Sequence, residues 1–190
     1  MESKTRKTLV DQYKDGYRAV AEALAGATAE DLDARPAPGK WTAREVVHHL
    51  ADSEMTSAIR LRLLLAVDNP AILGYDQDDF ARRLHYDRPI EASLDAFKAS
   101  RRTTAEILDR MSEDEWRREG THTEHGRYTV EKWLEIYSTH AHKHAEQIKV
   151  ARDSAKKKYA PAAMPSRGHA KPRRGIGVSS RWGWGPSASE

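Results

Sequence analysis

Apolar residues recur at intervals of three and four along most of this chain, which is the spacing of one face of an α-helix. Four segments carry the pattern, at about residues 4–25, 42–69, 90–111 and 129–152. No competing segment has the apolar–polar alternation of a convincing strand. Because each helix must bury its apolar stripe against a neighbour, the pattern predicts an all-α protein folded as a four-helix bundle.

Local signals mark where the predicted helices begin and end. In Thr42-Ala-Arg-Glu45 the hydroxyl and the carboxylate have the spacing of a capping box, which predicts a helix start at Thr42. Residues 112–115 repeat this pattern and predict a brief helical turn. Residues 70–89 contain glycine, proline and several aspartates, so we expect a long connection there. Residues 116–128 contain two glycines and predict a loop or a small hairpin.

The composition is typical of a soluble helical protein with a charged exterior, since 38% of residues are hydrophobic and 32% are charged. No run of about 18 uncharged apolar residues exists to span a membrane, and the first residues lack the apolar core of a secretory signal. The chain has no cysteine, which excludes disulfides, thiolate metal ligands and a cysteine nucleophile. These features predict a cytoplasmic protein without a membrane span.

The net charge of +3 is unevenly distributed. Residues 152–190 hold nine Lys/Arg and two Asp/Glu, a net charge of +7, whereas the residues before them carry −4. The composition also shifts to Pro, Ser, Gly and Arg, which predicts a bundle over residues 1–153 and a disordered basic tail over residues 154–190. The tail could bind nucleic acid, with Trp182 and Trp184 stacking on bases, but a solubilising extension is the simpler interpretation and nucleic acid is not the favoured partner.

Histidines in two of the predicted helices have the spacing of a metal site. His140 and His144 are four residues apart, so they share a helix face, and periodicity places that face beside the buried stripe. His142 points to the opposite, charged side and is expected to be solvated. In the second helix, periodicity favours His49 over His48 for the buried face. Three converging imidazoles would form an open metal site, although spacing alone also allows half-buried histidines bonded to carboxylates across the bundle.

Other candidate residues carry weaker signals. His122 and His125 lie in the expected loop, where they could hold a ligand or form part of a turn. Asp52 comes one turn after the histidine pair of the second helix, so it could orient an imidazole or be a surface carboxylate. His85 and His169 have no partner near them in the sequence.

Two segments resemble motifs of a known family. GKWTAREVVHHLADSE, residues 39–54, resembles the first-histidine motif of the DinB-like proteins, especially the YfiT-type branch of metal-dependent hydrolases and thiol S-transferases. YSTHAHKHAEQI, residues 137–148, resembles the second motif, in which two ligand histidines are four residues apart and a Gln-Ile pair follows. The resemblance covers about residues 5–152.

The resemblance implies a ligand set, a fold and an assembly. It makes His49, His140 and His144 the metal ligands of an up-down four-helix bundle whose ion lies near one end of the core. Relatives of this kind are often dimers, so a homodimer is expected. The sequence departs from some close relatives at Glu54, where they carry another polar residue, and this implies a different substrate pocket.

Three histidines would leave coordination positions open for water or substrate. Two reaction classes follow: a low-molecular-weight thiol attacks an electrophilic small molecule, or metal hydroxide hydrolyses an ester or amide bond. The resemblance favours the thiol transferase. A third interpretation is a non-catalytic scaffold whose basic tail binds nucleic acid. Zinc or nickel is the expected ion, with iron or manganese as alternatives. Tyr137 could donate to a substrate oxyanion or be a core residue, and Glu45 is assigned to capping.

Overall fold

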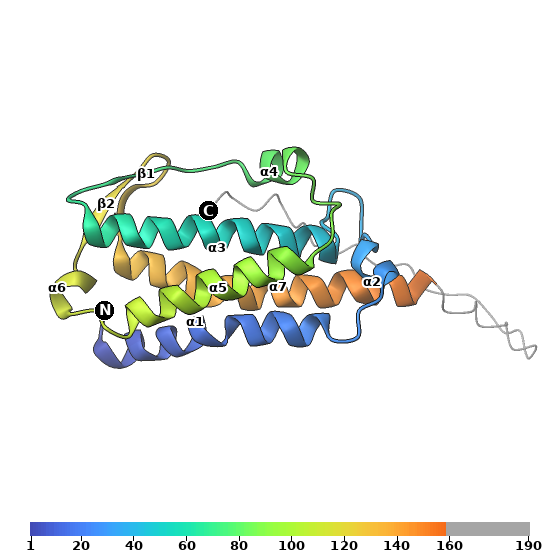
Figure 1. Ribbon diagram of the computed structural model, residues 1–190, viewed down its shortest axis with the longest axis horizontal. Helices are drawn as coiled ribbons and strands as arrows, with labels where there is room; N and C mark the ends of the chain where they lie inside the picture. The colour runs from blue at the N-terminus through green and yellow to red at the C-terminus, as the bar shows by residue number, and fades with distance from the viewer. Residues whose placement is uncertain (159–190) are drawn as a thin grey trace, which may run out of the picture.

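Four long helices lie side by side along the molecule (Figure 1). The computed structural model describes residues 1–158 of the chain. Its long helices are α1 (Ser3–Leu24), α3 (Ala43–Ala66), α5 (Glu91–Leu108) and α7 (Val130–Lys158). They match the four predicted segments, except that α7 continues to Lys158, five residues past the expected end of the bundle. The predicted four-helix bundle is confirmed.

Three short helices occupy the connections: α2 (Ala29–Asp33), α4 (Gln77–Arg83) and α6 (Glu113–Trp116). Both predicted capping boxes form, at the start of α3 and at the start of α6. Helix α4 lies in the connection for which the sequence predicted only turns. It is stabilised by its N-cap, because the Asp76 carboxylate accepts hydrogen bonds from the backbone N–H groups of Asp78 and Asp79. Seven residues are too few for a periodic signal to reveal such a helix.

A small sheet covers one end of the bundle. Its strands are β1 (Ala71–Ile72), β2 (Glu119–His122) and β3 (Gly126–Thr129), in the order β1-β2-β3. Strands β2 and β3 form an antiparallel hairpin, which is one of the two alternatives that the sequence left open, whereas β1 pairs parallel with β2. Gly120 permits this parallel pairing, because a Cβ there would lie 2.5 Å from the Pro70 carbonyl oxygen. These strands are only two and four residues long, which is too short for apolar–polar alternation to reveal them in the sequence.

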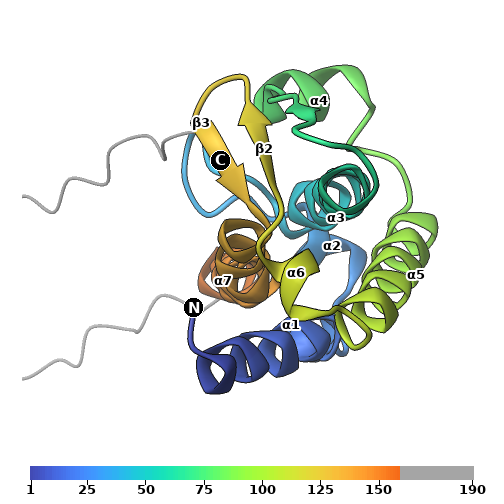
Figure 2. The same cartoon turned by 90° about the vertical axis from the view of Figure 1, so that its left-hand side faces the viewer.

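The helices do not simply alternate in direction. Residues 67–90 carry the chain from the sheet end of α3 back along the bundle to the start of α5, so α3 and α5 run the same way (Figures 1 and 2). Helices α1 and α7 run in the opposite direction and pack against each other. As a result α3, which also packs against α7, brings its first turns close to the middle of α7.

The bundle core consists of two apolar clusters separated by a polar layer. The cluster near α2 includes Val46 and Phe97, and the cluster near the sheet includes Leu61 and Trp133. The buried polar side chains between the clusters include Glu54 and Ser57 of α3, Arg101 of α5 and His140 of α7, and the Tyr13 hydroxyl of α1 donates to Glu54. Within residues 1–158, no helix has the length and apolar character needed to cross a membrane.

Candidate metal centre

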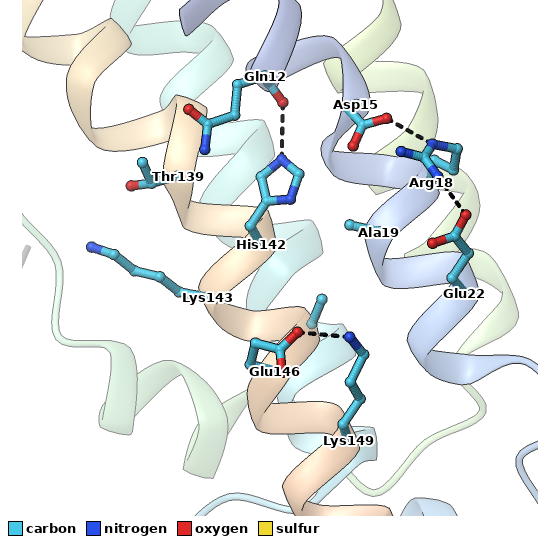
Figure 3. Close-up of a pocket in the computed structure, with 11 residues that line it drawn as sticks. Gln12, Asp15, Arg18, Ala19, Glu22, Thr139, His142, Lys143, Glu146 and Lys149 are labelled. Atoms are coloured by element: carbon cyan, nitrogen blue, oxygen red, sulfur yellow. Dashed lines mark hydrogen bonds and ion pairs between the residues drawn. The ribbon is translucent and has the colours of Figure 1, made fainter.

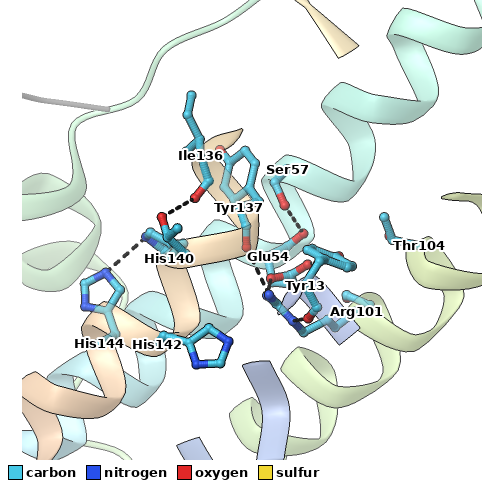
Figure 4. A network of polar contacts seen from close by, with 12 residues as sticks. Tyr13, Glu54, Ser57, Arg101, Thr104, Ile136, Tyr137, His140, His142 and His144 are labelled. Carbon is cyan, nitrogen blue, oxygen red and sulfur yellow. Dashed lines mark hydrogen bonds and ion pairs between the residues drawn. The ribbon is translucent and has the colours of Figure 1, made fainter. Parts of the chain in front are cut away.

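Three histidine side chains meet at the boundary between the two apolar clusters. His49 comes from α3. His140 and His144 come from α7 and are shown in Figure 4. The Nε2 atom of His140 lies 3.4 Å from Nε2 of His49 and 3.0 Å from Nε2 of His144. His49 and His140 are 3% and 2% exposed, whereas His144 is half-buried. The structure therefore brings together the three residues singled out from the sequence.

The spacing of these nitrogens fits a shared cation. With metal–nitrogen bonds of about 2.0–2.1 Å, two ligand nitrogens lie roughly 3.3 Å apart at a tetrahedral angle and roughly 2.9 Å apart at 90°. The observed distances of 3.0 and 3.4 Å fall in this range. Three neutral imidazoles cannot satisfy one another by hydrogen bonds alone, because each ring nitrogen is either a donor or an acceptor. The three residues could therefore hold a metal ion.

Neighbouring groups fix the tautomer of His144 and keep His49 neutral, as metal binding requires. The Nδ1–H group of His144 donates to the Gln147 side-chain oxygen at 2.6 Å, so in the neutral ring the Nε2 lone pair faces the other two histidines. Trp41 packs against the His49 ring with centroids 4.8 Å apart. Burial lowers the pKa of His49 well below its usual value, and nearby His144 and His140 lower it further. His49 is therefore neutral at pH 7, and its buried Nδ1 has no hydrogen-bond partner in the described part of the chain.

His48 lies outside the triad, as the helix phase predicted, but its surroundings differ from the expected ones. The side chain is fully buried, and its Nε2–H donates to the Arg88 backbone carbonyl at 3.0 Å. Because that nitrogen donates, Nδ1 accepts from the Ser93 hydroxyl at 2.8 Å. His48 thus anchors α3 to the start of α5. This partner in α5 is 45 residues away along the chain, so helix phase alone could not reveal the contact.

Two further side chains, His142 and Asp52, have partners that the sequence did not indicate. His142, expected to be solvated, is half-buried, and its Nε2–H donates to the Gln12 backbone carbonyl at 3.1 Å. It borders a groove of about 520 Å³ between α1 and α7, on the other side of α7 from the triad (Figure 3). Asp52 does not bind an imidazole, since its carboxylate accepts from the Tyr86 hydroxyl at 2.7 Å. Burial, together with this hydrogen bond, raises the pKa of Tyr86.

The polar layer next to the triad contains a buried ion pair that the sequence did not reveal. Arg101 Nη1 donates to Glu54 at 2.5 Å, and the side chains are 2% and 0% exposed (Figure 4). The Tyr13 hydroxyl donates to the other Glu54 oxygen. Arg101 also donates to the backbone carbonyls of Tyr13 and Tyr137 at 2.6 and 3.0 Å. The departure at Glu54 therefore belongs to a core interaction and not to the lining of a pocket.

A second histidine cluster lies in the hairpin. His122, Glu124 and His125 have ligand atoms within 4.8 Å of one another, so this group could also hold an ion. Its geometry is less favourable, because the two rings are stacked at an interplanar angle of 20° and their lone pairs run side by side instead of converging. His122 Nδ1 already accepts from the Glu124 backbone N–H at 3.1 Å. The nearby Arg60 charge would also repel a cation here.

The remaining sequence candidates have no place in the triad. Glu45 forms the predicted cap and pairs with Arg35 at 2.8 Å. His85 is exposed and adopts a positive φ of 54°. His169, Trp182, Trp184 and the basic tail after Lys158 lie outside the described residues.

Known proteins share both the fold and the region that contains the triad. The sequence profile of the DinB superfamily matches residues 12–148. The chain belongs to the DinB superfamily. A relative from Oceanobacillus iheyensis, named "Putative metal-dependent hydrolase", is 33% identical over 139 residues, which are 73% of this chain and 81% of the relative. A Bacillus cereus protein with the same description is 26% identical over 141 residues, covering 74% and 82%.

A solved structure of another DinB-like protein extends the comparison to three dimensions. YfiT from Bacillus subtilis is described as a probable metal-dependent hydrolase with an unusual four-helix bundle topology. It matches with a TM-score of 0.74 and 25% identity, over 83% of this chain and 90% of YfiT.

Proposed function

We propose that this DinB member is a divalent-metal-dependent enzyme whose ion is held by His49, His140 and His144. The observation that carries the proposal is the convergence of three Nε2 atoms at 3.0 and 3.4 Å in a largely buried position. The names of the relatives, which refer to metal-dependent hydrolysis, support a metal enzyme as a class. Zinc and nickel suit a site of three neutral nitrogens, and iron and manganese are the alternatives.

The finer proposal is transfer of a low-molecular-weight thiol to an electrophilic small molecule. A divalent ion bound by three neutral nitrogens lowers the pKa of a coordinated thiol so that the thiolate predominates near neutral pH. The ligands contribute no negative charge, so an anionic sulfur balances the charge of the site. The chain has no cysteine, and the thiol is therefore an external molecule.

The chain's own residues position the reactants. Gln147 fixes the orientation of the His144 ring through its Nδ1–H group, and Trp41 covers one side of His49. His144 is the most exposed of the three, so the reactants approach the site from its side. The apolar cluster beyond His49 excludes water from the inner side of the site.

Metal content tests the site assignment. Protein purified without an affinity tag and reconstituted with zinc or nickel is expected to hold about one equivalent, and His144→Ala is expected to lose it while its far-ultraviolet circular dichroism stays unchanged. His142→Ala is the matched control on the same helix and is expected to keep the metal. Less than about 0.2 equivalents in the reconstituted parent protein would refute the metal enzyme, and stoichiometric metal in His144→Ala would refute the ligand set.

Hydrolysis is the second candidate, because the names of the relatives point to it. The two reactions are separated by incubating the metal-loaded protein with cellular thiols and monochlorobimane, and in parallel with ester substrates. Thiol transfer predicts thiol-dependent conjugation that His144→Ala abolishes. Ester hydrolysis without added thiol, together with no conjugation, would replace thiol transfer by hydrolysis.

A further inference from the structure

Arg60 of α3 is a buried cation without a counter-charge. The residue is only 4% exposed. Nη1 donates to the Tyr137 hydroxyl at 3.1 Å and Nη2 donates to the Leu73 backbone carbonyl at 2.6 Å. The Nε–H group is buried without a partner in residues 1–158. Both acceptors are neutral, whereas the guanidinium is always charged.

The chain also contains a second buried arginine, Arg101, whose charge is compensated by a carboxylate. Arg101 is equally buried, but it pairs with Glu54 at 2.5 Å, and all three of its nitrogens donate hydrogen bonds. Isolated charges are costly to bury, and buried charges in proteins are therefore normally paired. In the described part of the chain, no carboxylate lies within 4.0 Å of the Arg60 guanidinium. Arg60 thus lacks the anion that Arg101 has.

The position of Arg60 connects it to the triad. Arg60 and His49 are eleven residues apart on α3, close to three helical turns, so they share one face of the helix. Tyr137 bridges the two groups, because its hydroxyl accepts from Arg60 and its ring meets the His140 ring edge-on with centroids 5.8 Å apart. Since long side chains on a helix incline toward the start of that helix, we expect a gap on the order of 10 Å between the Arg60 guanidinium and the triad.

The residues around Arg60 do not supply the missing charge. Tyr75 lies 5.7 Å from the guanidinium, measured to the ring centroid. His122 is 2% exposed, and burial, reinforced by the Arg60 charge, lowers its pKa, so it is neutral at pH 7. Glu124 is 45% exposed and pairs with His125 at 3.9 Å. These neighbours leave the guanidinium without a carboxylate partner, and a planar anion is the group that a guanidinium binds best.

We propose that Arg60 binds the carboxylate of the enzyme's small-molecule substrate while the reacting group of that molecule lies at the triad. This proposal rests on the proposed function and adds a substrate class: a molecule that carries a carboxylate several bonds away from its thiol or other reacting group. Tyr137 lies between the two ends and fixes their separation. Arg60 acts here as a binding residue and does not take part in bond breaking.

A pair of thiols of equal length tests the proposal. Zinc-loaded protein is titrated calorimetrically with 6-mercaptohexanoate and with 6-mercaptohexanol. A charged hydrogen bond in a desolvated site predicts that the carboxylate binds roughly tenfold tighter or more. This preference is expected to disappear in Arg60→Gln and to persist in part in Arg60→Lys. Arg62→Gln is the matched control, because Arg62 lies on the same helix but bonds Ala58 and Thr104. A ratio near one in the parent protein, or an unchanged ratio in Arg60→Gln, would overturn the proposal.

A second measurement needs neither a variant nor a metal, and it decides the question if Arg60→Gln does not fold. Hexanoate and hexanol are added to metal-free protein while the Arg60 ¹⁵Nε resonance is followed by NMR. A saturable shift with hexanoate alone supports the carboxylate site, and no shift at millimolar hexanoate overturns it. A hexanoate shift without binding of either thiol to the zinc protein refutes the thiol chemistry and leaves the carboxylate site standing. Equal binding of the two thiols to the zinc protein refutes the carboxylate site and leaves the thiol chemistry standing.

Discussion

Replacing Glu54 by Gln removes one charge from an ion pair that the bundle encloses completely. The Glu54 and Arg101 side chains are 0% and 2% exposed, so water cannot solvate the Arg101 charge that remains. The amide also presents an N–H group to one of two donors, the Arg101 guanidinium or the Tyr13 hydroxyl. Breaking a buried pair in this way costs about 3–5 kcal/mol. For a domain of this size, that predicts a fall in Tm of about 6–20 °C.

The assay is urea unfolding followed by circular dichroism at 222 nm, with a chelator present so that metal binding does not contribute. Glu22→Gln is the control, since Glu22 pairs with Arg18 on the exposed face of α1 and its loss is expected to leave the midpoint unchanged. The double variant Glu54→Met/Arg101→Met is expected to be more stable than Glu54→Gln, because no lone charge stays buried. A free energy of unfolding for Glu54→Gln within about 1 kcal/mol of the parent protein would show that the pair is not what compensates the Arg101 charge.

Three further predictions concern the histidines. Gln147→Leu removes the acceptor of the His144 Nδ1–H group and is expected to weaken metal affinity about 10–100-fold, measured by competition with a chelator; unchanged affinity would contradict the proposed orientation. His48→Ala is expected to lower the free energy of unfolding by about 2–4 kcal/mol yet keep the full metal content, whereas loss of metal would reverse the choice of His49 over His48. Folding lowers the pKa values of His48, His49 and His122, so the unfolded chain binds more protons, and the stability of the metal-free protein is expected to decrease as pH falls below the usual histidine value of 6.5. Urea titrations from pH 7.5 to 5 measure this slope, which His122→Gln should make shallower; a slope unaffected by that change would refute the assignment.

The long helices and the inward direction of the three histidines could be predicted because both depend on local spacing, whereas their meeting at one site was implied by the family resemblance. A stripe at three- and four-residue intervals identifies a helix, and the same periodicity places His140 and His144 on one face and His49 at the inner side of α3. The capping boxes at Thr42 and Ser112 are local signals as well, since each needs only four consecutive residues.

Features that depend on distant partners could not be read in this way. Helix phase gives the direction of a side chain relative to its own helix, but it does not say which residue will meet it. Helix phase therefore gave no partner for His48, whose ring bonds Ser93 of α5. In the same way, Asp52 bonds Tyr86 and Glu54 bonds Arg101, partners that lie 34 and 47 residues away along the chain.

The small sheet sets the axial register of the two helices that carry the triad. Strand β1 follows α3, and β3 ends at Thr129, where α7 begins with Val130. Through β2, the pairing of β1 with the hairpin fastens the end of α3 to the start of α7. A slip of one residue between these helices would displace His49 from His140 by about 1.5 Å, whereas a metal site tolerates errors of only about 0.2 Å. The two-residue pairing of β1 with β2 thus helps to hold the three ligands within reach of one ion.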